Sequence, residues 1–437
     1  MPTKTLPEQP SLAHLKNQAQ DLQDLALAGD PTVIARLREF HPRAKSVIDG
    51  GKLKLSDAQL VIAREYGHPS WPRLKAFVEL QGLTGSLKRA IDENDFPAVR
   101  RLMTEHPELH RARMGYGDNG PLTWVAECRV PRVPPNDTRL AMARWMIEHG
   151  SDMHQGGDGP LMRAALDDMR IPMMELLVEL GADVNANWGG YYPIICAPAE
   201  TLAPQALKWL LDHGADPSTP TSMYGTPLFM LLGTYARNSP AKHTCLEVLA
   251  DHGVDIPDTP PMAVHRGRID LLERHVDADP SVLARRYSLA EIYPPDLGFP
   301  PEGGMHGTPL DGATLLHLAV DYHEVDIVRW LLDAGAGVDA KAEIDDDGFG
   351  GQTALFNTVV NLGRKTDEIA RLLLDAGADP NARATLRKQL KDMGDPEKER
   401  MREFRDVTPA QFGRLFAEPG FVNEAALTAI VDAGGTA

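Results

Sequence analysis

A short closing sequence with glycine at its centre recurs from residue 148 onward. Seven copies read EHGSD, ELGAD, DHGAD, DHGVD, DAGAG, DAGAD and DAGGT, with their glycines at Gly150, Gly181, Gly214, Gly253, Gly335, Gly377 and Gly434. Most successive glycines lie 31 to 57 residues apart, and the interval of 82 after Gly253 equals about two such units. Recurrence at a short period is typical of chains built from small stacked units. The sequence therefore predicts an array in which each unit packs on its neighbours.

The clearest unit runs from Gly312 to Ala340 and predicts two short helices joined by a bend. Thr314 is placed to cap a first helix, Leu315 to Val320. A second helix, Val325 to Asp333, carries Val and Leu residues along one face, and the glycine of the closing sequence ends it. The polar residues Asp321 to Glu324 form the bend. Helices this short cannot bury their apolar faces alone, so the unit needs neighbours of its own kind.

Similar openings precede the other closings. Thr226-Pro227-Leu228 and Thr408-Pro409 pair a capping hydroxyl with a proline in the first helical turn, and Leu316-His317-Leu318-Ala319 adds a histidine. These motifs resemble the ankyrin repeat family, whose unit of about 33 residues opens with T-P-L-H-x-A. The resemblance covers Ser86 to Ala437. It implies an all-α ankyrin-repeat solenoid of about nine helix-turn-helix units with β-turn or finger loops, some of the units degenerate.

We predict two domains, a helical N-terminal cap over residues 1–82 and the repeat array over residues 83–437. In the cap the pattern predicts helices from Ser11 to Ala28, from Pro31 to Phe40 and from Trp71 to about Leu80, and a capping box at Ser56 and Gln59. The segment LKLSDAQLVIAREYGHPSWPRLKAFV resembles leaders that precede the repeats of many bacterial ankyrin proteins. That resemblance implies a bacterial origin and a capping role.

Four stretches interrupt the repeat pattern and are predicted to be inserted loops: 128–137, 233–242, 288–311 and 383–406. Prolines exclude helix from the first stretch. The Pro/Gly-rich stretch 288–311 is expected to be an extended finger, and Glu343 to Gly351 a second finger. The stretch 383–406 is dense in both charges and is predicted to be helical around Gly394-Asp395-Pro396.

Composition narrows the function classes. The formal charge of −17 argues against a phosphate-driven nucleic-acid binder and against binding to an anionic membrane surface. No apolar run approaches the ~20 residues of a membrane helix, and the N-terminus has no apolar signal core. We expect a cytoplasmic protein that acts as a monomer.

Several motifs resemble chemical sites but are incomplete. HPELH holds His106 and His110 on either side of Pro107, in an order that differs from HExxH. The histidines that precede three of the closing glycines are interpreted as helix C-terminal residues favoured by the helix dipole. Glu343 to Gly348 begins like a calcium loop, but its twelfth position is Ala354. We predict no catalytic residues, no cofactor and no metal.

The resemblance implies a protein-protein interaction scaffold that binds a protein partner through the concave first-helix face and the finger loops. The aromatic residues Trp188, Tyr191 and Tyr192 on a finger turn are expected either to reach solvent, where they make good interface anchors, or to pack between fingers. The candidate partner-binding residues are Trp188, Tyr191, Tyr192, Met223, Tyr224, Phe299 and His306.

Two other function classes stay open. One is an inhibitor or immunity-type protein whose acidic face binds a basic enzyme, for which strong salt dependence of binding is expected. The other is an enzyme or toxin with its site in the inserted loops 128–137 and 288–311. A deep pocket with convergent titratable groups would favour that class.

Overall fold

The computed structural model describes residues 3–7, 10–49, 53–114, 119–130, 132–155, 159–188, 192–218, 225–299, 306–363, 365–390, 400–416 and 419–437, without the side chains of 188, 389, 390, 400 and 419. The chain forms two compact units, Met1–Pro160 and Leu161–Ala437. The predicted boundary at residue 82 falls inside a helix, because α5 runs without a break from Trp71 to Asp92. None of the described helices combines the length and apolar character needed to cross a membrane.

The first unit begins with a helical bundle that has its own core. Its helices are α1 Leu12–Leu27, α2 Pro31–Phe40, α3 Ala44–Asp49, α4 Leu55–Glu65 and the first half of α5. Leu15, Leu22, Leu37 and Ile62 are buried together in this core. The predicted starts of α1 and α2 are confirmed, and the Asp30 carboxylate accepts hydrogen bonds from the first turn of α2.

Two details of this bundle correct the prediction. Helix α4 starts at Leu55 rather than at the expected Ser56 capping box, because the Asp57 carboxylate accepts the Lys54 amide at 2.9 Å. Helix α5 continues past Leu80 because Leu87 and Ile91 extend its buried face. The unit then continues through α6 Phe96–Glu105, η1 Pro107–Arg111, α7 Pro121–Glu127 and α8 Asp137–Glu148.

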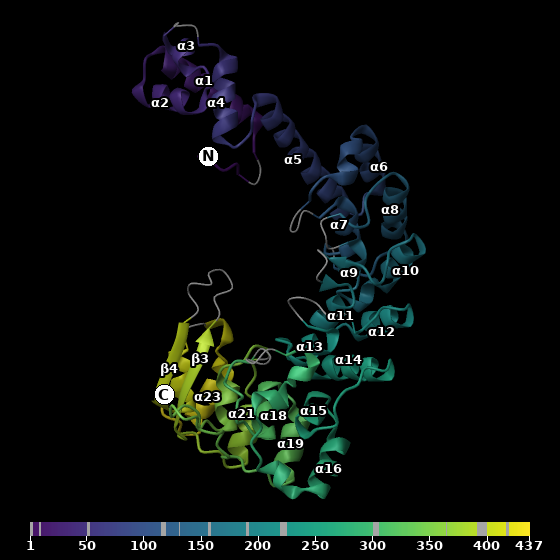
Figure 1. Ribbon diagram of the computed structural model, residues 1–437, viewed down its shortest axis with the longest axis vertical. Coiled ribbons are helices and arrows are strands. Elements are labelled where there is room, and N and C mark those ends of the chain that lie inside the picture. Colours follow the sequence, from purple (N-terminus) through teal and green to yellow (C-terminus); the bar gives the residue numbers. More distant parts are fainter. Residues whose placement is uncertain are drawn as a thin grey trace. The chain divides into compact units, whose positions relative to one another are not determined.

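The second unit is built from successive pairs of short antiparallel helices (Figure 1). After α9 Pro160–Ala164 and α10 Ile171–Glu179, the pairs are α11 Cys196–Thr201 with α12 Pro204–Asp212, α13 Pro227–Leu232 with α14 Ser239–Asp251, α15 Pro260–His265 with α16 Ile269–Ala278, α18 Leu315–Asp321 with α19 Val325–Asp333, α20 Ala354–Val359 with α21 Glu368–Asp375, and α22 Pro409–Leu415 with α23 Glu424–Asp432. First helices pack on first helices and second helices on second helices in much of the array, as for α18 with α20 and α19 with α21.

The closing glycine acts as the sequence predicted. Gly335 has φ of +94°, its amide donates to the Leu332 carbonyl at 3.1 Å, and the Ala336 amide donates to the Leu331 carbonyl at 2.9 Å. The other closing glycines also have φ between +83° and +106°. The closing sequence is thus a helix stop that satisfies the last carbonyls of the second helix.

Replacing Gly335 with valine should lower the free energy of unfolding by roughly 1–2 kcal/mol, because a β-branched residue resists a left-handed backbone. A Cβ atom built at Gly335 meets no atom within 4 Å, so the cost is conformational rather than steric. Denaturant titration of the variant measures the loss. Gly335→Asn, which tolerates this conformation better, should lose less; equal losses for both variants would refute a backbone origin.

Residues just after the glycine connect one helix pair to the next. Asn185 donates to the Gly214 carbonyl at 2.9 Å and accepts the Asp216 amide at 2.8 Å. Asn381 repeats both contacts with the Gly434 carbonyl and the Thr436 amide. Asn185 and Asn381 each lie two residues after a closing sequence, and their side chains form a hydrogen-bonded ladder to the closing sequence of the next helix pair.

His317 makes a second connection of this kind. Its Nε2 lies 3.0 Å from the Gln352 carbonyl, which can only accept, so Nε2 carries the proton and donates. Its Nδ1 then accepts from the Thr314 hydroxyl at 2.8 Å and the Thr314 amide at 3.3 Å. The side chain is fully buried, and burial lowers the pKa of His317 to about 4.

Acid should destabilise the second unit through His317. The unfolded chain takes up the proton near pH 6.5, whereas the folded imidazole stays neutral down to about pH 4. The stability contributed above pH 6.5 is therefore lost as the pH falls toward 4, by about 3 kcal/mol. His317→Gln keeps a donor and an acceptor but cannot titrate, so its urea midpoint should fall less steeply between pH 7 and 4.5. A pH dependence identical to that of the wild type would show that His317 is not the group responsible.

The predicted insertions 233–242 and 288–311 differ from expectation. In 233–242 only Gly233 to Asn238 is a loop, because Ser239 already begins α14. The stretch 288–311 contains α17 Leu289–Ile292 and η5 Pro295–Leu297 and folds inward, with Tyr293 and Leu310 buried, so the predicted extended finger is wrong for its described part. By contrast, the described part of 128–136 is irregular, as its prolines predicted.

The predicted helical insertion at 383–406 is also wrong for its described part. Strands β3 Ala384–Leu390 and β4 Arg400–Val407 form an antiparallel hairpin, and the Gly394-Asp395-Pro396 segment lies outside the described residues. Leu386 and Phe404 face each other across the strands and are buried, with the Phe404 ring edge-on to Phe412 at 4.9 Å. Alternate burial on one face of the pair favours strand over helix. A second hairpin, β1 Asn187–Trp188 with β2 Tyr192–Pro193, joins α10 to α11.

Candidate functional site

Charged and titratable side chains converge inside the second unit, at the bend between α18 and α19. The sequence predicts this bend, Asp321 to Glu324, as a polar turn. In the structure Asp321 and Glu324 are only 1% and 3% exposed. Buried carboxylates need cationic or hydrogen-bonding partners to offset their desolvation. The cationic partners, Arg237 and Lys242, come from a segment that lies 82 to 84 residues earlier in the chain.

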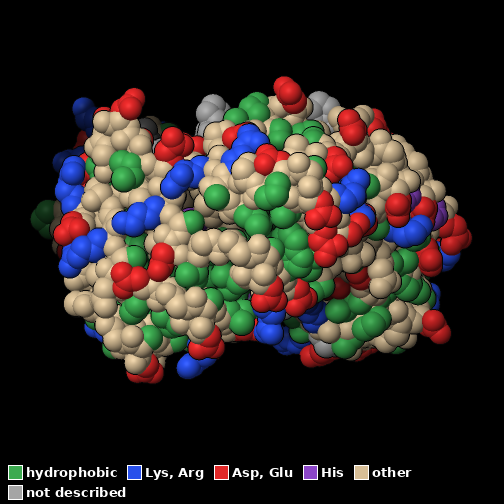
Figure 2. Space-filling model, turned by 90° about the horizontal axis from the view of Figure 1, so that it is seen from below, with side chains coloured by type: hydrophobic (Ala, Val, Ile, Leu, Met, Phe, Trp, Pro, Cys, Tyr) green, Lys and Arg blue, Asp and Glu red, His purple; other side chains and the backbone are tan. Residues whose placement is uncertain are grey.

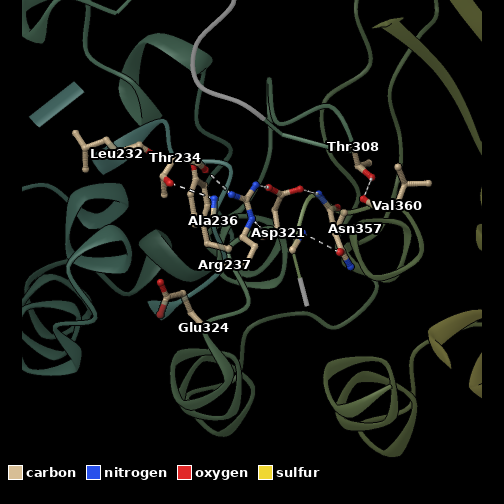
Figure 3. Close-up of polar contacts among 12 residues, drawn as sticks. Leu232, Thr234, Ala236, Arg237, Thr308, Asp321, Glu324, Asn357 and Val360 are labelled. Atoms are coloured by element: carbon tan, nitrogen blue, oxygen red, sulfur yellow. Dashed lines mark hydrogen bonds and ion pairs between the residues drawn. The ribbon is translucent and has the colours of Figure 1, made fainter. Parts of the chain in front are cut away.

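Arg237, in the loop between α13 and α14, is the partner of Asp321 (Figure 3). Its Nε donates to the Asp321 carbonyl at 2.7 Å and its terminal nitrogen lies 2.9 Å from the Asp321 carboxylate. The guanidinium also donates to the Thr234 carbonyl. Asn357 of α20 approaches the other carboxylate oxygen at 3.4 Å. One buried ion pair thus joins three helix pairs.

Lys242, in the first turn of α14, forms a second buried pair with Glu324. The Lys242 ammonium lies 3.7 Å from one Glu324 oxygen and donates to His265 Nδ1 at 3.2 Å. The other Glu324 oxygen is 2.9 Å from His243 Nε2, at the edge of the cluster. Because Lys242 can only donate, His265 must present a neutral nitrogen to it.

Tyr322 lies between the two pairs. Arg237 and Lys242 approach its ring to 4.3 and 3.9 Å of the centroid, distances at which a ring attracts cations. Its hydroxyl donates to the Leu232 carbonyl at 2.6 Å, so the Tyr293 hydroxyl, 2.8 Å away, donates to Tyr322. We call Arg237, Lys242, His265, Tyr293, Asp321, Tyr322 and Glu324 the buried ionic cluster.

Burial dominates the electrostatics of this cluster. It lowers the pKa of Lys242 to about 8 and raises the pKa of Asp321, although Arg237 opposes the second shift. The pKa of His265 falls well below its ordinary value because of burial and the adjacent ammonium. Burial raises the pKa of Tyr293. With two cations and two carboxylates, the cluster balances its own charge.

Convergent groups with shifted pKa values occur at active sites but also in structural ion-pair networks. Lys242 and Asp321 are each 1% exposed and His265 is fully buried, so a substrate would have to displace protein contacts to reach them. Each charged group already has an oppositely charged neighbour. The arrangement therefore favours structural coupling over group transfer.

Sequence reasoning missed the members of the cluster. It identified the loop 233–242 and the polar bend separately, and no sequence pattern connects positions 84 residues apart. The available signal was a pair of cations in one irregular stretch and a pair of carboxylates in a bend whose flanking helices are apolar.

Two of the candidate partner-binding residues are buried, so for them packing within the protein is observed rather than exposure to solvent. Tyr192 is 6% exposed, because the β1–β2 hairpin folds it onto α11, where its hydroxyl donates to Glu200 at 2.7 Å. Phe299 is 5% exposed and packs against Phe229 and Tyr293, with ring centroids 4.4 and 5.2 Å apart. Buried rings offer no contact area to a partner in this conformation.

The remaining predicted anchors stay predictions. Trp188 lies in β1, but its side chain is outside the described residues, as are Tyr191, Met223 and Tyr224. His306 is partly exposed, with its ring parallel to Tyr293 at 6.5 Å.

In the second finger, Glu343 to Gly351, the carboxylates that resemble the start of a calcium loop form ion pairs with an arginine side chain of the same chain. Asp345 accepts the amides of Asp347 and Phe349, and the carboxylates of Asp345 and Asp347 lie 2.6 and 2.8 Å from Arg387 of β3. Among the described residues, no three His, Cys, Asp or Glu side chains gather as metal ligands would. His110, of the HPELH motif, is buried with Nδ1 2.8 Å from the Ser151 hydroxyl.

The histidines before the closing glycines lie at helix C-termini, as predicted. The Nδ1 atoms of His149, His213 and His252 each lie 2.7–2.8 Å from a carbonyl four residues earlier. His252 also approaches Asp212 of the preceding pair at 3.1 Å, and these contacts raise its pKa.

The finger and the hairpin form one continuous surface. The Gly350 amide donates to the Thr385 carbonyl at 2.6 Å and the Thr385 amide returns to Gly350 at 3.3 Å. We call residues 343–351, 384–390 and 400–407 the finger–hairpin surface. It carries two large apolar side chains in solvent, Ile344 at 60% and Met401 at 56% exposure.

A comparison with protein families identifies the repeats at the centre of this unit. Residues 288–384 match a family model described as ankyrin repeats in three copies. The matched segment includes α18 with α19 and α20 with α21, and it ends at the first residue of β3. The helix pairs, left-handed closing glycines and buried Thr314–His317 cap agree with that match. The chain therefore contains ankyrin repeats over residues 288–384.

Proposed function

We propose that this chain is a protein-binding scaffold that holds its partner through the finger–hairpin surface and the adjoining first helices, without catalysing a reaction. Ankyrin repeats in general suggest a protein-binding role, and such repeats occupy residues 288–384. The observation that carries the proposal is the exposure of Ile344 and Met401 on a surface continuous with these repeats. Apolar side chains that desolvate at the centre of an interface supply much of the binding energy.

The surface is held in shape before any partner arrives. Arg387 joins the finger to β3 through two carboxylates, and the guanidiniums of Arg387 and Arg405 lie 4.8 and 5.1 Å from the centroid of the Phe349 ring. A preorganised surface loses little conformational entropy on binding. On the face of the molecule drawn in Figure 2, acidic and basic side chains lie among hydrophobic ones. The finger–hairpin surface itself carries the exposed Ile344 and Met401 together with Asp345, Asp347, Arg387 and Arg405, which suits a partner with apolar anchors and polar contacts at its rim.

The test is affinity capture followed by crosslinking on the intact chain. The variant Ile344→Ser/Met401→Ser removes both exposed apolar side chains, and Leu27→Ser, 59% exposed in the first unit, is the matched control. All three proteins must show the same circular dichroism spectrum. We expect a protein captured by the wild type and the control to be lost from the double variant, because its apolar anchors are gone.

Retention of that protein by the double variant would move the binding site away from the finger–hairpin surface. Capture of no protein by the wild type would count against the scaffold. A third outcome would favour the inhibitor class, in which charge dominates recognition. In that outcome the wild type loses its captured protein in moderate salt, while the double variant captures the protein as well as the wild type does.

A further inference from the structure

The segment Gly233 to Lys242, which we call the latch, connects helix pairs that are not neighbours in the array. It leaves α13, contributes Arg237 and Lys242 to the buried ionic cluster, and enters α14. Its partners lie in the bend between α18 and α19, and the pair α15 and α16 intervenes in the sequence. In a simple repeat array each unit contacts only its nearest neighbours. The latch is an exception, because it contacts the bend between α18 and α19 across the intervening pair α15 and α16.

The intervening pair gives a reason for the latch. The main contacts of α16 are with α15 and η4 Pro280–Leu283, while α12 packs on α14 and α19 packs on α21. At α16 the layer of second helices therefore lacks the extensive packing seen between α12 and α14 and between α19 and α21. The latch contacts this pair, since the Lys242 ammonium lies 3.2 Å from His265 Nδ1 of α15, and a Cβ atom added at Gly267 would meet the ring of the next residue, His243, at 2.1 Å. It also passes the loop after α20, where a Cβ atom at Gly363 would meet the Arg237 side chain at 2.2 Å.

The distribution of charge makes this contact all-or-none. The latch supplies both cations, Arg237 and Lys242, and the bend supplies both carboxylates, Asp321 and Glu324. Either side alone would be a buried pair of like charges, which is strongly unfavourable. If one side opens, the other must also open or be left with uncompensated buried charge. The two sides therefore share one free energy of opening.

We infer that the latch couples α13 and α14 to α18 through α21, so that these helix pairs open as one cooperative unit instead of pair by pair. The ankyrin segment is then stabilised by a loop that precedes it in the sequence.

Native-state hydrogen exchange of the intact chain, followed by mass spectrometry over a series of low denaturant concentrations, tests the coupling. In the wild type, the amides of α14 and α18 should share one protection factor and one denaturant dependence, because they exchange through the same opening. In Arg237→Met, α14 should exchange through a smaller opening with a lower denaturant dependence, and it should lose at least about tenfold more protection than α20 and α21.

Arg268→Met is the matched control, since Arg268 forms exposed ion pairs with Glu247 and Asp270 in the same unit. It should keep the shared opening. If Arg237→Met fails to fold, Arg237→Lys retains the charge with fewer hydrogen bonds and should show the same separation to a smaller degree. Separate openings of α14 and α18 in the wild type would overturn the inference. So would an equal loss of protection from α13 to α21 in the variant.

Discussion

Asp321→Ala should lower the free energy of unfolding of the second unit by about 3–5 kcal/mol, the largest loss expected from a single substitution in this chain. The substitution leaves the Arg237 guanidinium buried without its carboxylate, 2.9 Å from the vacated position. The expected loss is dominated by that unpaired charge rather than by the attraction removed. Urea denaturation monitored by circular dichroism gives the value.

Asp270→Ala is the control for this experiment. Asp270 lies 2.6 Å from Arg268, a closer pair than Asp321 and Arg237, but its side chain is 60% exposed. Water replaces an exposed partner, so the control should change the urea midpoint far less. Similar midpoints for Asp321→Ala and Asp270→Ala would show that burial of the cluster contributes nothing.

Leu331→Ala should cost about 2–5 kcal/mol, because it removes a fully buried side chain from the second helix of the clearest repeat. Leu331 is fully buried where α19 packs against α18 and α21. The cavity left behind adds to the lost transfer free energy, and short helices have little freedom to collapse into it. Denaturant unfolding of the intact chain measures the loss.

The control is Leu415→Ala, in the same unit but 59% exposed at the end of α22. A surface truncation of this kind should stay within about 0.5 kcal/mol of the wild type. A loss below about 1 kcal/mol for Leu331→Ala would mean that α19 does not pack as described.

Local signals in the sequence predicted the repeat units well. The second helix Val325–Asp333 has its predicted bounds, and the first helix extends one residue further, to Asp321. Thr314, Asp30 and Gly335 each perform the capping or stop role that their chemistry favours. These features depend on contacts within a few residues, which a single sequence reveals.

Features that depend on distant contacts could not be predicted in the same way. Leu386 and Phe404 belong to strands that are separated in the sequence by residues 391–399, and their period-two burial was hidden among charged neighbours. In the sequence Arg237 looks like an ordinary loop residue, because its partner Asp321 lies 84 residues later. Tyr192 and Phe299 lie on turns that fold inward, and the sequence gives the turn without its direction.

Hydrogen exchange of the intact chain with and without its captured partner tests the scaffold most directly. We expect the partner to slow exchange at residues 343–351 and 400–407 in the wild type, and Ile344→Ser/Met401→Ser to abolish that protection while both proteins remain folded. Protection confined to other parts of the chain, or unchanged protection in the double variant, would contradict a scaffold that binds through the finger–hairpin surface.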